Sequence, residues 1–203
     1  MKEKIILTDA DGVLCRWWSA FESYAIKCGH IQIPNTEHHY NLSKRFEADV
    51  DEMRKLVIEF NESEEIANLK PLTGAVDTIS NLTSRGFRFV CITSLSDAPS
   101  ASLYREENLL RLFGDVFDDI ICLPVGQSKG HILERWADSG LFWLEDHFMN
   151  AEAGYEVGLN PILFDDPTNR NLQTDLFPRV TGPNLWKEVE GIILDEYELT
   201  ECA

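Results

Sequence analysis

Short apolar segments alternate along this chain with segments that have the spacing of amphipathic helices. Apolar runs of strand length occur at residues 5–8, 87–92, 120–123, 141–144 and 161–164. Helical patterns occur at 74–85, 100–113, 129–136 and 151–159, so that each lies between two consecutive strands. This alternation is typical of parallel strands joined by right-handed helical crossovers. It predicts an α/β fold built on a doubly wound parallel sheet.

The interval between the first predicted strand and residue 72 departs from this pattern. It is too long for one crossover helix, it lacks a convincing strand, and helical patterns occur within it at 18–27, 51–60 and 63–69. An unstructured loop of this length is uncommon in a compact domain. We therefore predict a small helical cap at 16–71, inserted into a core formed by 1–15 and 72–203. A terminal helix is expected at 185–194, followed by a frayed acidic tail.

Composition limits the partners that this chain can bind. The 203 residues, 44% of them hydrophobic, suit one compact domain, or a core domain with a modest insertion. The formal charge of −17 argues against a nucleic-acid polymer, because proteins that bind such polymers need a basic surface to displace counterions. A small anionic substrate is compatible with this charge if a divalent cation and one or two basic side chains line its pocket.

The cysteines and the N-terminal segment indicate a compartment. Five cysteines are scattered without a CxxC spacing, which is typical of reduced thiols in a cytoplasmic protein. They are Cys15, Cys28, Cys91, Cys122 and Cys202. Only three strongly apolar residues precede Thr8, too few for a signal-peptide core, and no apolar run approaches the length of a membrane span. We therefore expect a cytoplasmic protein without a membrane partner.

Two aspartates follow the first predicted strand. Asp9 and Asp11 precede Gly12, whose conformational freedom relaxes the backbone at the strand end. In this arrangement one carboxylate can attack a phosphorus atom while its neighbour transfers protons. DxD pairs are also common in solvated turns, so the position of the pair is what matters. It lies at the carboxyl edge of the predicted parallel sheet, which is where α/β proteins bind ligands.

Three further polar features follow later strands. Thr93 and Ser94 end the second strand and offer hydroxyl and backbone donors to a phosphate oxygen. Lys129, after the third strand, can stabilise the negative charge of phosphoryl transfer. Glu145 and Asp146 follow the fourth strand and can close a Mg²⁺ site with the first aspartate. Each feature alone is explained as a cap, a turn or a surface charge. Four strand ends that carry them in this order predict a site for phosphoryl chemistry.

These residues resemble the four motifs of the haloacid dehalogenase superfamily of phosphohydrolases, which are hhhhDxDG, hhh(S/T), a lysine, and an acidic pair or GDxxxD. The resemblance spans about residues 5–150, and the sequence DADGVL is its most specific part. It implies that Asp9 is the nucleophile that forms an aspartyl phosphate, and that Asp11 is first a general acid and then a general base. It also implies that Thr93 contacts the phosphate and that Lys129 stabilises the developing charge.

The same resemblance implies a Mg²⁺ cofactor. Its protein ligands would be the carboxylates of Asp9 and Asp146 and the backbone carbonyl of Asp11. The fourth motif departs from the usual pattern in two ways, because Glu145 stands in place of an aspartate and Asn150 in place of a second acid. Both side chains can still orient a metal-bound water or the lysine.

Within the superfamily, the layout is similar to that of the 5'(3')-deoxyribonucleotidases, which also have a small helical cap between the first two motifs. Segments 69–76 and 91–94 carry this likeness. It implies a nucleoside monophosphate as substrate, with the base held by cap aromatics and the phosphate directed at Asp9. Trp17 and Trp18 are the aromatic residues that we expect to contact the base, because aromatic rings stack on bases.

Other interpretations stay open at this point. The four motifs are compatible with a phosphatase of a sugar phosphate or phosphoglycolate, and with a phosphate-binding protein of weak catalytic power. Phe21 is expected in the cap's own core. Lys44 and Arg45 are expected to be solvated or to reach a phosphate or ribose, and Arg170 is a candidate for closing over the site. Exposed cap aromatics are also compatible with a homodimer.

Overall fold

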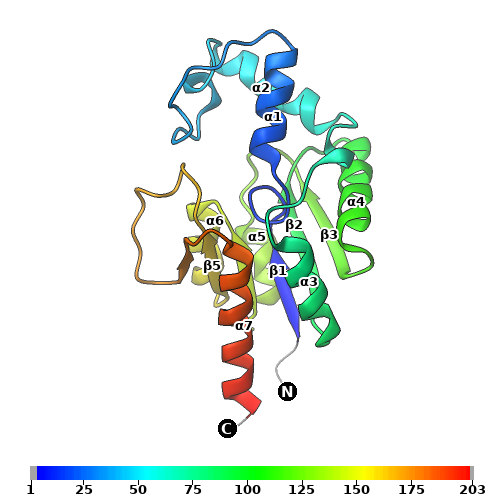
Figure 1. The fold of residues 1–203 in the computed structure, drawn as a ribbon, viewed down its shortest axis with the longest axis vertical. Coiled ribbons are helices and arrows are strands. Elements are labelled where there is room, and N and C mark those ends of the chain that lie inside the picture. The colour runs from blue at the N-terminus through cyan, green and yellow to red at the C-terminus, as the bar shows by residue number, and fades with distance from the viewer. Residues whose placement is uncertain (1–3, 202–203) are drawn as a thin grey trace.

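The computed structural model describes residues 4–201, and its strands form a six-stranded sheet in which every pairing is parallel (Figure 1). The spatial order is β3-β2-β1-β4-β5-β6. The strands are β1 (Ile5–Thr8), β2 (Arg88–Ser94), β3 (Phe117–Leu123), β4 (Phe142–Glu145), β5 (Asn160–Phe164) and β6 (Arg179–Val180). This architecture confirms the predicted α/β fold. Since β1 lies between β2 and β4, the residues that follow it are flanked by the ends of both neighbours.

Alternate side chains of β1 enter two different hydrophobic cores, as the period of a strand requires. Ile6 belongs to the larger core, on the face covered by α3 (Ala75–Ser84), α4 (Pro99–Phe113) and α7 (Leu185–Glu201). Leu7 belongs to the smaller core on the opposite face. That face is covered by α5 (Gly130–Leu133), η3 (Glu134–Trp136) and α6 (Phe148–Glu156). The sheet is therefore the middle of three layers.

Four helical elements lie between β1 and α3, within the predicted cap. They are α1 (Trp17–Lys27), η1 (Leu42–Lys44), α2 (Val50–Asn61) and η2 (Ile66–Asn68). Figure 1 shows α1 and α2 beyond the carboxyl ends of the strands. Phe21, Phe46 and Phe60 are fully buried and pack edge to face, and they belong to the same continuous hydrophobic cluster as the larger core of the sheet. Phe21 is therefore a core residue, as expected, but the core that it joins is shared with the sheet.

The two linkers of the cap lie side by side. The amide of Arg16 donates to the carbonyl of Lys70 at 2.9 Å, and the amide of Leu72 donates to the carbonyl of Leu14 at 2.8 Å. These hydrogen bonds fall at the expected junctions of cap and core. The division of the chain into two domains at these positions stays a prediction.

Several element bounds differ from those expected. β6 was not anticipated, because two residues are too few for a detectable period. The segment 63–69 forms only the short turn η2, and the segment 129–136 is divided between α5 and η3. The terminal helix was expected to end at 194 but continues to Glu201, and its Tyr197 packs against Phe87 with ring centroids 4.8 Å apart. This tertiary contact extends a helix whose local sequence is acidic and weakly periodic.

Helix α7 is also tied to the loop that follows β1. Trp186 is fully buried, and its indole N–H donates to the backbone carbonyl of Val13 at 2.8 Å. Its ring also packs edge to face against Phe164 of β5. A loop near the N-terminus of the chain is therefore held in place by a helix near its C-terminus.

Two structural features bear on the expected compartment, namely the state of the cysteines and the length and polarity of the helices. Cys15, Cys28, Cys91 and Cys122 are free thiols, and Cys202 lies outside the described residues. Within residues 4–201, every helix is too short or too polar to cross a bilayer.

Candidate active site

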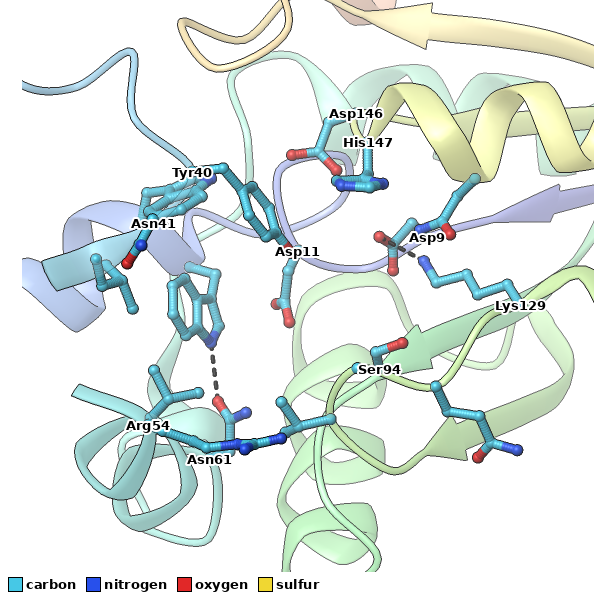
Figure 2. A pocket seen from close by; sticks show the side chains of 18 of the residues that line it. Asp9, Asp11, Tyr40, Asn41, Arg54, Asn61, Ser94, Lys129, Asp146 and His147 are labelled. Carbon is cyan, nitrogen blue, oxygen red and sulfur yellow. Dashed lines mark hydrogen bonds and ion pairs between the residues drawn. The ribbon is translucent and has the colours of Figure 1, made fainter. Parts of the chain in front are cut away.

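The predicted site residues meet at the carboxyl edge of the sheet (Figure 2). Asp9 directly follows β1, and its amide donates to the carbonyl of Leu144 in β4 at 2.8 Å. Glu145 ends β4 and Asp146 follows it, and these two acids and Asp9 each offer an oxygen within 4.8 Å of the others. Lys129 enters the same cluster from the segment before α5. Four of the residues that the motifs singled out therefore share one small volume.

The Asp9 carboxylate is fixed at both oxygens. Oδ1 accepts a hydrogen bond from the amide of Ala10 at 2.6 Å, and Oδ2 lies 2.7 Å from Nζ of Lys129. The lysine is itself buried, and its Nζ also lies 2.9 Å from Oε2 of Glu145. Burial alone would lower the pKa of Lys129, but the carboxylates of Asp9 and Glu145 outweigh it and raise that pKa above its usual range. The lysine is therefore a permanent positive charge in contact with the predicted nucleophile.

Glu145 uses its carboxylate to organise its neighbours. Oε1 accepts hydrogen bonds from the amides of Asp146 at 3.1 Å and His147 at 2.9 Å, while Oε2 accepts from Lys129. Burial and the nearby charge of Asp9 raise the pKa of Glu145 to about 7, against the opposing effect of Lys129. These contacts orient the lysine and the start of α6. They give a physical reason for the glutamate at this position.

Asp146 lies against Gly12 in the loop after β1. Gly12 has a φ of +78°, and a Cβ atom built on it would collide with the Asp146 carboxylate. The absence of a side chain at position 12 therefore makes room for this acid. Burial raises the pKa of Asp146 well above its usual value, and the charges of Glu145 and Asp9 raise it further.

These residues fit a Mg²⁺ ion. The cradle at Gly12 brings a third, partly exposed acid to two buried ones, and the mutual repulsion of the three carboxylates favours a bound cation. The donors are hard oxygens, which Mg²⁺ prefers. Glu145 already accepts three hydrogen bonds, so Asp9 and Asp146 are the better candidates for carboxylate ligands.

Asp11 is held apart from this cluster. Its carboxylate projects into the open space between the cap side chains and Ser94 (Figure 2). Nη2 of Arg105 in α4 donates to both of its oxygens, at 2.6 and 2.8 Å. Burial raises the pKa of Asp11 above its usual value, although Arg105 opposes this shift.

A cavity of about 600 Å³ lies between the core and the cap. The core contributes mostly polar side chains to its wall, among them Asp9, Asp11, Ser94, Lys129, Asp146 and His147. The cap contributes mostly aromatic and apolar ones, among them Trp17, Trp18, Tyr40, Met53 and Val57, together with Arg54. Ser94 is thus placed where it was expected to meet a substrate. Thr93 is fully buried, and its hydroxyl finds no hydrogen-bond partner among residues 4–201.

The two expected base contacts differ in their surroundings. The Trp17 ring stacks on Phe21 at 4.8 Å, and its indole N–H donates to Asn61 at 2.9 Å, so this residue is anchored in the cap core. Trp18 lies edge-on to Tyr40, with ring centroids 6.1 Å apart, and Tyr40 in turn contacts His147 of the core at 4.9 Å. Trp18 also has the Arg45 guanidinium over its ring, so each of the two tryptophans already has a partner over one face.

Two basic side chains do not lie where the sequence analysis placed them. Arg45 was expected to be solvated or to reach a phosphate, but it is buried, pairs with Glu22 and lies 4.4 Å over the Trp18 ring. Arg170 was a candidate for closing over the site, but it pairs with Asp165 at 2.8 Å and lines a separate, smaller cavity. In each case a neighbouring carboxylate already pairs with the guanidinium.

Sequence reasoning missed two residues that support the site. Asn169 is buried, and its amide donates to the carbonyls of Asp146 at 2.6 Å and Phe164 at 2.8 Å, which ties the loop after β5 to the acidic loop after β4. The other is Arg105, which was a detectable signal. It occupies a position that helical spacing from Ala101 and Leu109 assigns to the buried face of α4.

Comparison of the sequence with known proteins shows a likeness to a phage protein. The sequence matches no model of a known protein family. Over 135 residues it is 30% identical to an uncharacterized 32.4 kDa protein of the Gp30–rIII intergenic region in Enterobacteria phage T4. The match covers 64% of this chain and 48% of the phage protein, so the chain spans about half the length of this relative.

Comparison of the structures is more extensive. A predicted phosphatase from Clostridium acetobutylicum has a TM-score of 0.67 and 14% identity, over 96% of this chain and 100% of that one. A haloacid dehalogenase-like hydrolase from Streptococcus pneumoniae has a TM-score of 0.64 and 14% identity, over 95% and 99%. The D,D-heptose 1,7-bisphosphate phosphatase from B. bronchiseptica, complexed with magnesium and phosphate, has a TM-score of 0.58 and 17% identity, over 97% and 99%. These likenesses cover nearly all of the chain, and they show that it has the fold of the haloacid dehalogenase-like hydrolases.

Proposed function

We propose that this chain is a Mg²⁺-dependent phosphomonoesterase that acts through an aspartyl-phosphate intermediate. The observation that carries the proposal is the fixed position of Asp9, whose carboxylate lies 2.7 Å from a buried lysine and beside Asp146. A nucleophile needs such orientation and charge compensation in order to approach a dianionic phosphate. The phosphatases among proteins of this fold support the same activity.

The first half-reaction forms a covalent intermediate. A carboxylate oxygen of Asp9 attacks phosphorus in line, the bond from phosphorus to the ester oxygen breaks, and Asp11 gives its proton to the departing alkoxide. Lys129 stabilises the negative charge on the transferring group. When bound by Asp9, Asp146 and the backbone carbonyl of Asp11, Mg²⁺ would supply further charge neutralisation.

The second half-reaction releases phosphate. Asp11, now a carboxylate, takes a proton from a water molecule, and the water oxygen bonds to phosphorus as the acyl phosphate bond breaks. Asp9 is regenerated as a carboxylate, and Asp11 regains the proton that it needs for the next cycle.

For the substrate, we propose a nucleoside monophosphate. The apolar wall that Trp18 and Tyr40 provide supports a flat base opposite the phosphate site. A sugar phosphate is the second candidate, because a heptose bisphosphate phosphatase is among the proteins of similar fold. The charge of −17 supports a small substrate rather than a nucleic-acid polymer. The free cysteines support a cytoplasmic location.

The test is phosphate release from p-nitrophenyl phosphate and from a panel of deoxyribonucleoside, ribonucleoside and sugar phosphates, with Mg²⁺ or with EDTA. We expect Mg²⁺-dependent turnover, and the best substrate of the panel identifies the substrate class. Asp9→Asn should abolish turnover while the protein stays folded. Binding of phosphate without turnover would instead support the phosphate-binding alternative, and substantial activity in Asp9→Asn would exclude the covalent scheme.

A further inference from the structure

Arg105 is a fully buried arginine in contact with a predicted catalytic group. Its side chain has no exposed surface, whereas the Asp11 side chain is 20% exposed and lines the cavity. The carboxylate therefore faces the cavity, and the guanidinium lies behind it in the protein. Both oxygens of Asp11 share one nitrogen of Arg105, at 2.6 and 2.8 Å, so rotation of the carboxylate breaks at least one contact.

The contact with Asp11 is the main anchor of Arg105, because two of the other nitrogens of its guanidinium have no partner within residues 4–201. Nε and Nη1 are buried and have no hydrogen-bond partner among the described residues. Burial of an arginine is unfavourable unless a charge compensates it. Among the residues that the structure describes, Asp11 is the carboxylate that pairs with Arg105. The position of each side chain therefore depends on the other.

The same helix also holds the second linker of the cap. Asn108 of α4 donates to the carbonyls of Ala67 at 3.1 Å and Leu69 at 2.9 Å. Arg111, three residues after Asn108, donates to the same two carbonyls. Successive turns of α4 thus contact Asp11 and the cap linker.

We propose that Arg105 is a positioning residue that holds Asp11 against the cavity from behind, and that α4 thereby aligns Asp11 with the cap. The inference rests on the proposed function, in which Asp11 gives its proton to the leaving-group oxygen as the phosphorus–oxygen bond breaks. Proton donation requires the carboxyl group within hydrogen-bond reach of that oxygen. Without Arg105, the pKa of Asp11 loses an opposing effect and rises, so the proton stays available, but the side chain is free to turn away from the leaving-group oxygen. The loss of position therefore slows protonation of the leaving group.

The proposal predicts an effect that depends on the leaving group. An alkyl phosphate needs a proton on its departing oxygen, whereas p-nitrophenolate leaves without one. Arg105→Met should lower kcat/KM for the best alkyl phosphate of the panel by roughly 100-fold, and kcat/KM for p-nitrophenyl phosphate by less than roughly threefold. Arg105→Lys, which keeps the charge, should recover about tenfold of the loss.

Two controls separate positioning from general damage. In an Asp11→Asn background, Arg105→Met should cause little further loss of kcat/KM for the alkyl phosphate, because the two residues act as one unit. Arg111→Met keeps the contact between Arg105 and Asp11 but removes hydrogen bonds to the cap linker. It should lower kcat/KM for both substrates by the same factor. Thermal unfolding of each variant identifies any that fail to fold, in which case Arg105→Lys and its double variant carry the test.

The outcomes distinguish the two proposals. A wild-type protein without phosphatase activity would overturn the proposed function and this inference with it. Two results would overturn only the role of Arg105 when the wild type is active. One is that Arg105→Met lowers kcat/KM for both substrates by the same factor. The other is that Arg105→Met lowers kcat/KM for the alkyl phosphate by the same factor with and without Asp11→Asn.

Discussion

The two walls of the cavity are built on different principles. On the core side, Asp9 and Lys129 are buried, and short contacts with each other and with Glu145 behind them fix their charged atoms. On the cap side, Tyr40 and Arg54 are exposed, and Trp18 is only half-buried. Groups that are held by several neighbours suit chemistry, which needs one geometry. Groups that are held by few neighbours suit recognition, because their replacement changes the pocket without disturbing the sheet.

This difference leads to a general expectation. Variants of the core wall should change kcat, because they alter charge and orientation in the transition state. Variants of the cap wall should change KM, because they alter binding that the ground state already has. Each experiment below is a way to break this division or to sharpen it.

The largest effect is expected at Lys129. Lys129→Met removes the cation between Asp9 and Glu145 and leaves two buried carboxylates facing each other, so kcat should fall on the order of 10³-fold. Turnover of p-nitrophenyl phosphate at saturating Mg²⁺ measures this. Lys187→Met, which removes an exposed lysine paired with Glu190, is the matched control and should leave kcat unchanged. Equal activity of the two variants would contradict a role for Lys129 in charge stabilisation.

The next effect is expected at Gly12. A Cβ at this position displaces the Asp146 carboxylate, so Gly12→Ala should raise the Mg²⁺ concentration for half-maximal activity by about 10- to 100-fold. Gly29→Ala is the control, because Gly29 also has a positive φ, of +94°, with open space around it. Both variants carry the cost of a side chain at a positive φ, about 1–3 kcal/mol, but only the first disturbs the acid. The same Mg²⁺ requirement in both would show that backbone strain, and not displacement of Asp146, is the cause.

A smaller effect is expected on the cap side. Trp18→Ala removes a ring surface from the cavity wall and should raise KM for a nucleoside monophosphate by about tenfold, with kcat nearly unchanged. Trp18→Phe keeps an aromatic face and should restore most of the affinity. Steady-state kinetics with the best nucleotide of the panel measures both. A fall in kcat with constant KM would break the division between the two walls.

The smallest effect concerns stability without metal. Burial raises the pKa of Glu145 to about 7 from an ordinary value of 4.5, so the folded protein keeps a proton that the unfolded chain releases within this window. Stability should therefore decline as pH rises from about 4.5 to 7, by a few °C in Tm, since about 1 kcal/mol corresponds to ~2–4 °C in a chain of this size.

Thermal scans in EDTA across this pH range provide the measurement. Glu145→Gln should flatten the dependence, and Mg²⁺ should stabilise the wild type most at the upper end of the range, where the carboxylates are ionised. A Tm in EDTA that rises from pH 4.5 to 7 would contradict the direction of the shift.

The sheet and the core wall were largely predictable from sequence. Parallel strands present their carboxyl ends at one edge, so Asp9, Ser94 and Asp146 were bound to converge once the strands were identified. Lys129 was harder to place, because it lies beyond the loop after β3 and reaches the cluster through a long side chain. The structural comparisons confirm the fold, while the roles of these residues stay predictions.

The cap wall and the supporting contacts were less predictable. Arg45 carries the positive charge of a residue that binds phosphate, and only the tertiary contact with Glu22 shows that this charge is already paired. Asn169 sits in a loop without periodicity, so nothing in its local sequence indicates the bonds to Asp146 and Phe164. Arg105 differs from these, because a charged residue on the buried face of a helix is an inconsistency that sequence alone reveals.

The bond between the indole of Trp186 and the carbonyl of Val13 joins residues 173 positions apart. During synthesis, the aspartate loop emerges from the ribosome long before the residue that steadies it. A nascent chain that ends before residue 186 has every motif residue but lacks this support for the loop that carries them. We therefore expect activity to appear only after residue 186 has been made, and fragments that lack α7 to be inactive although their reactive groups are all present.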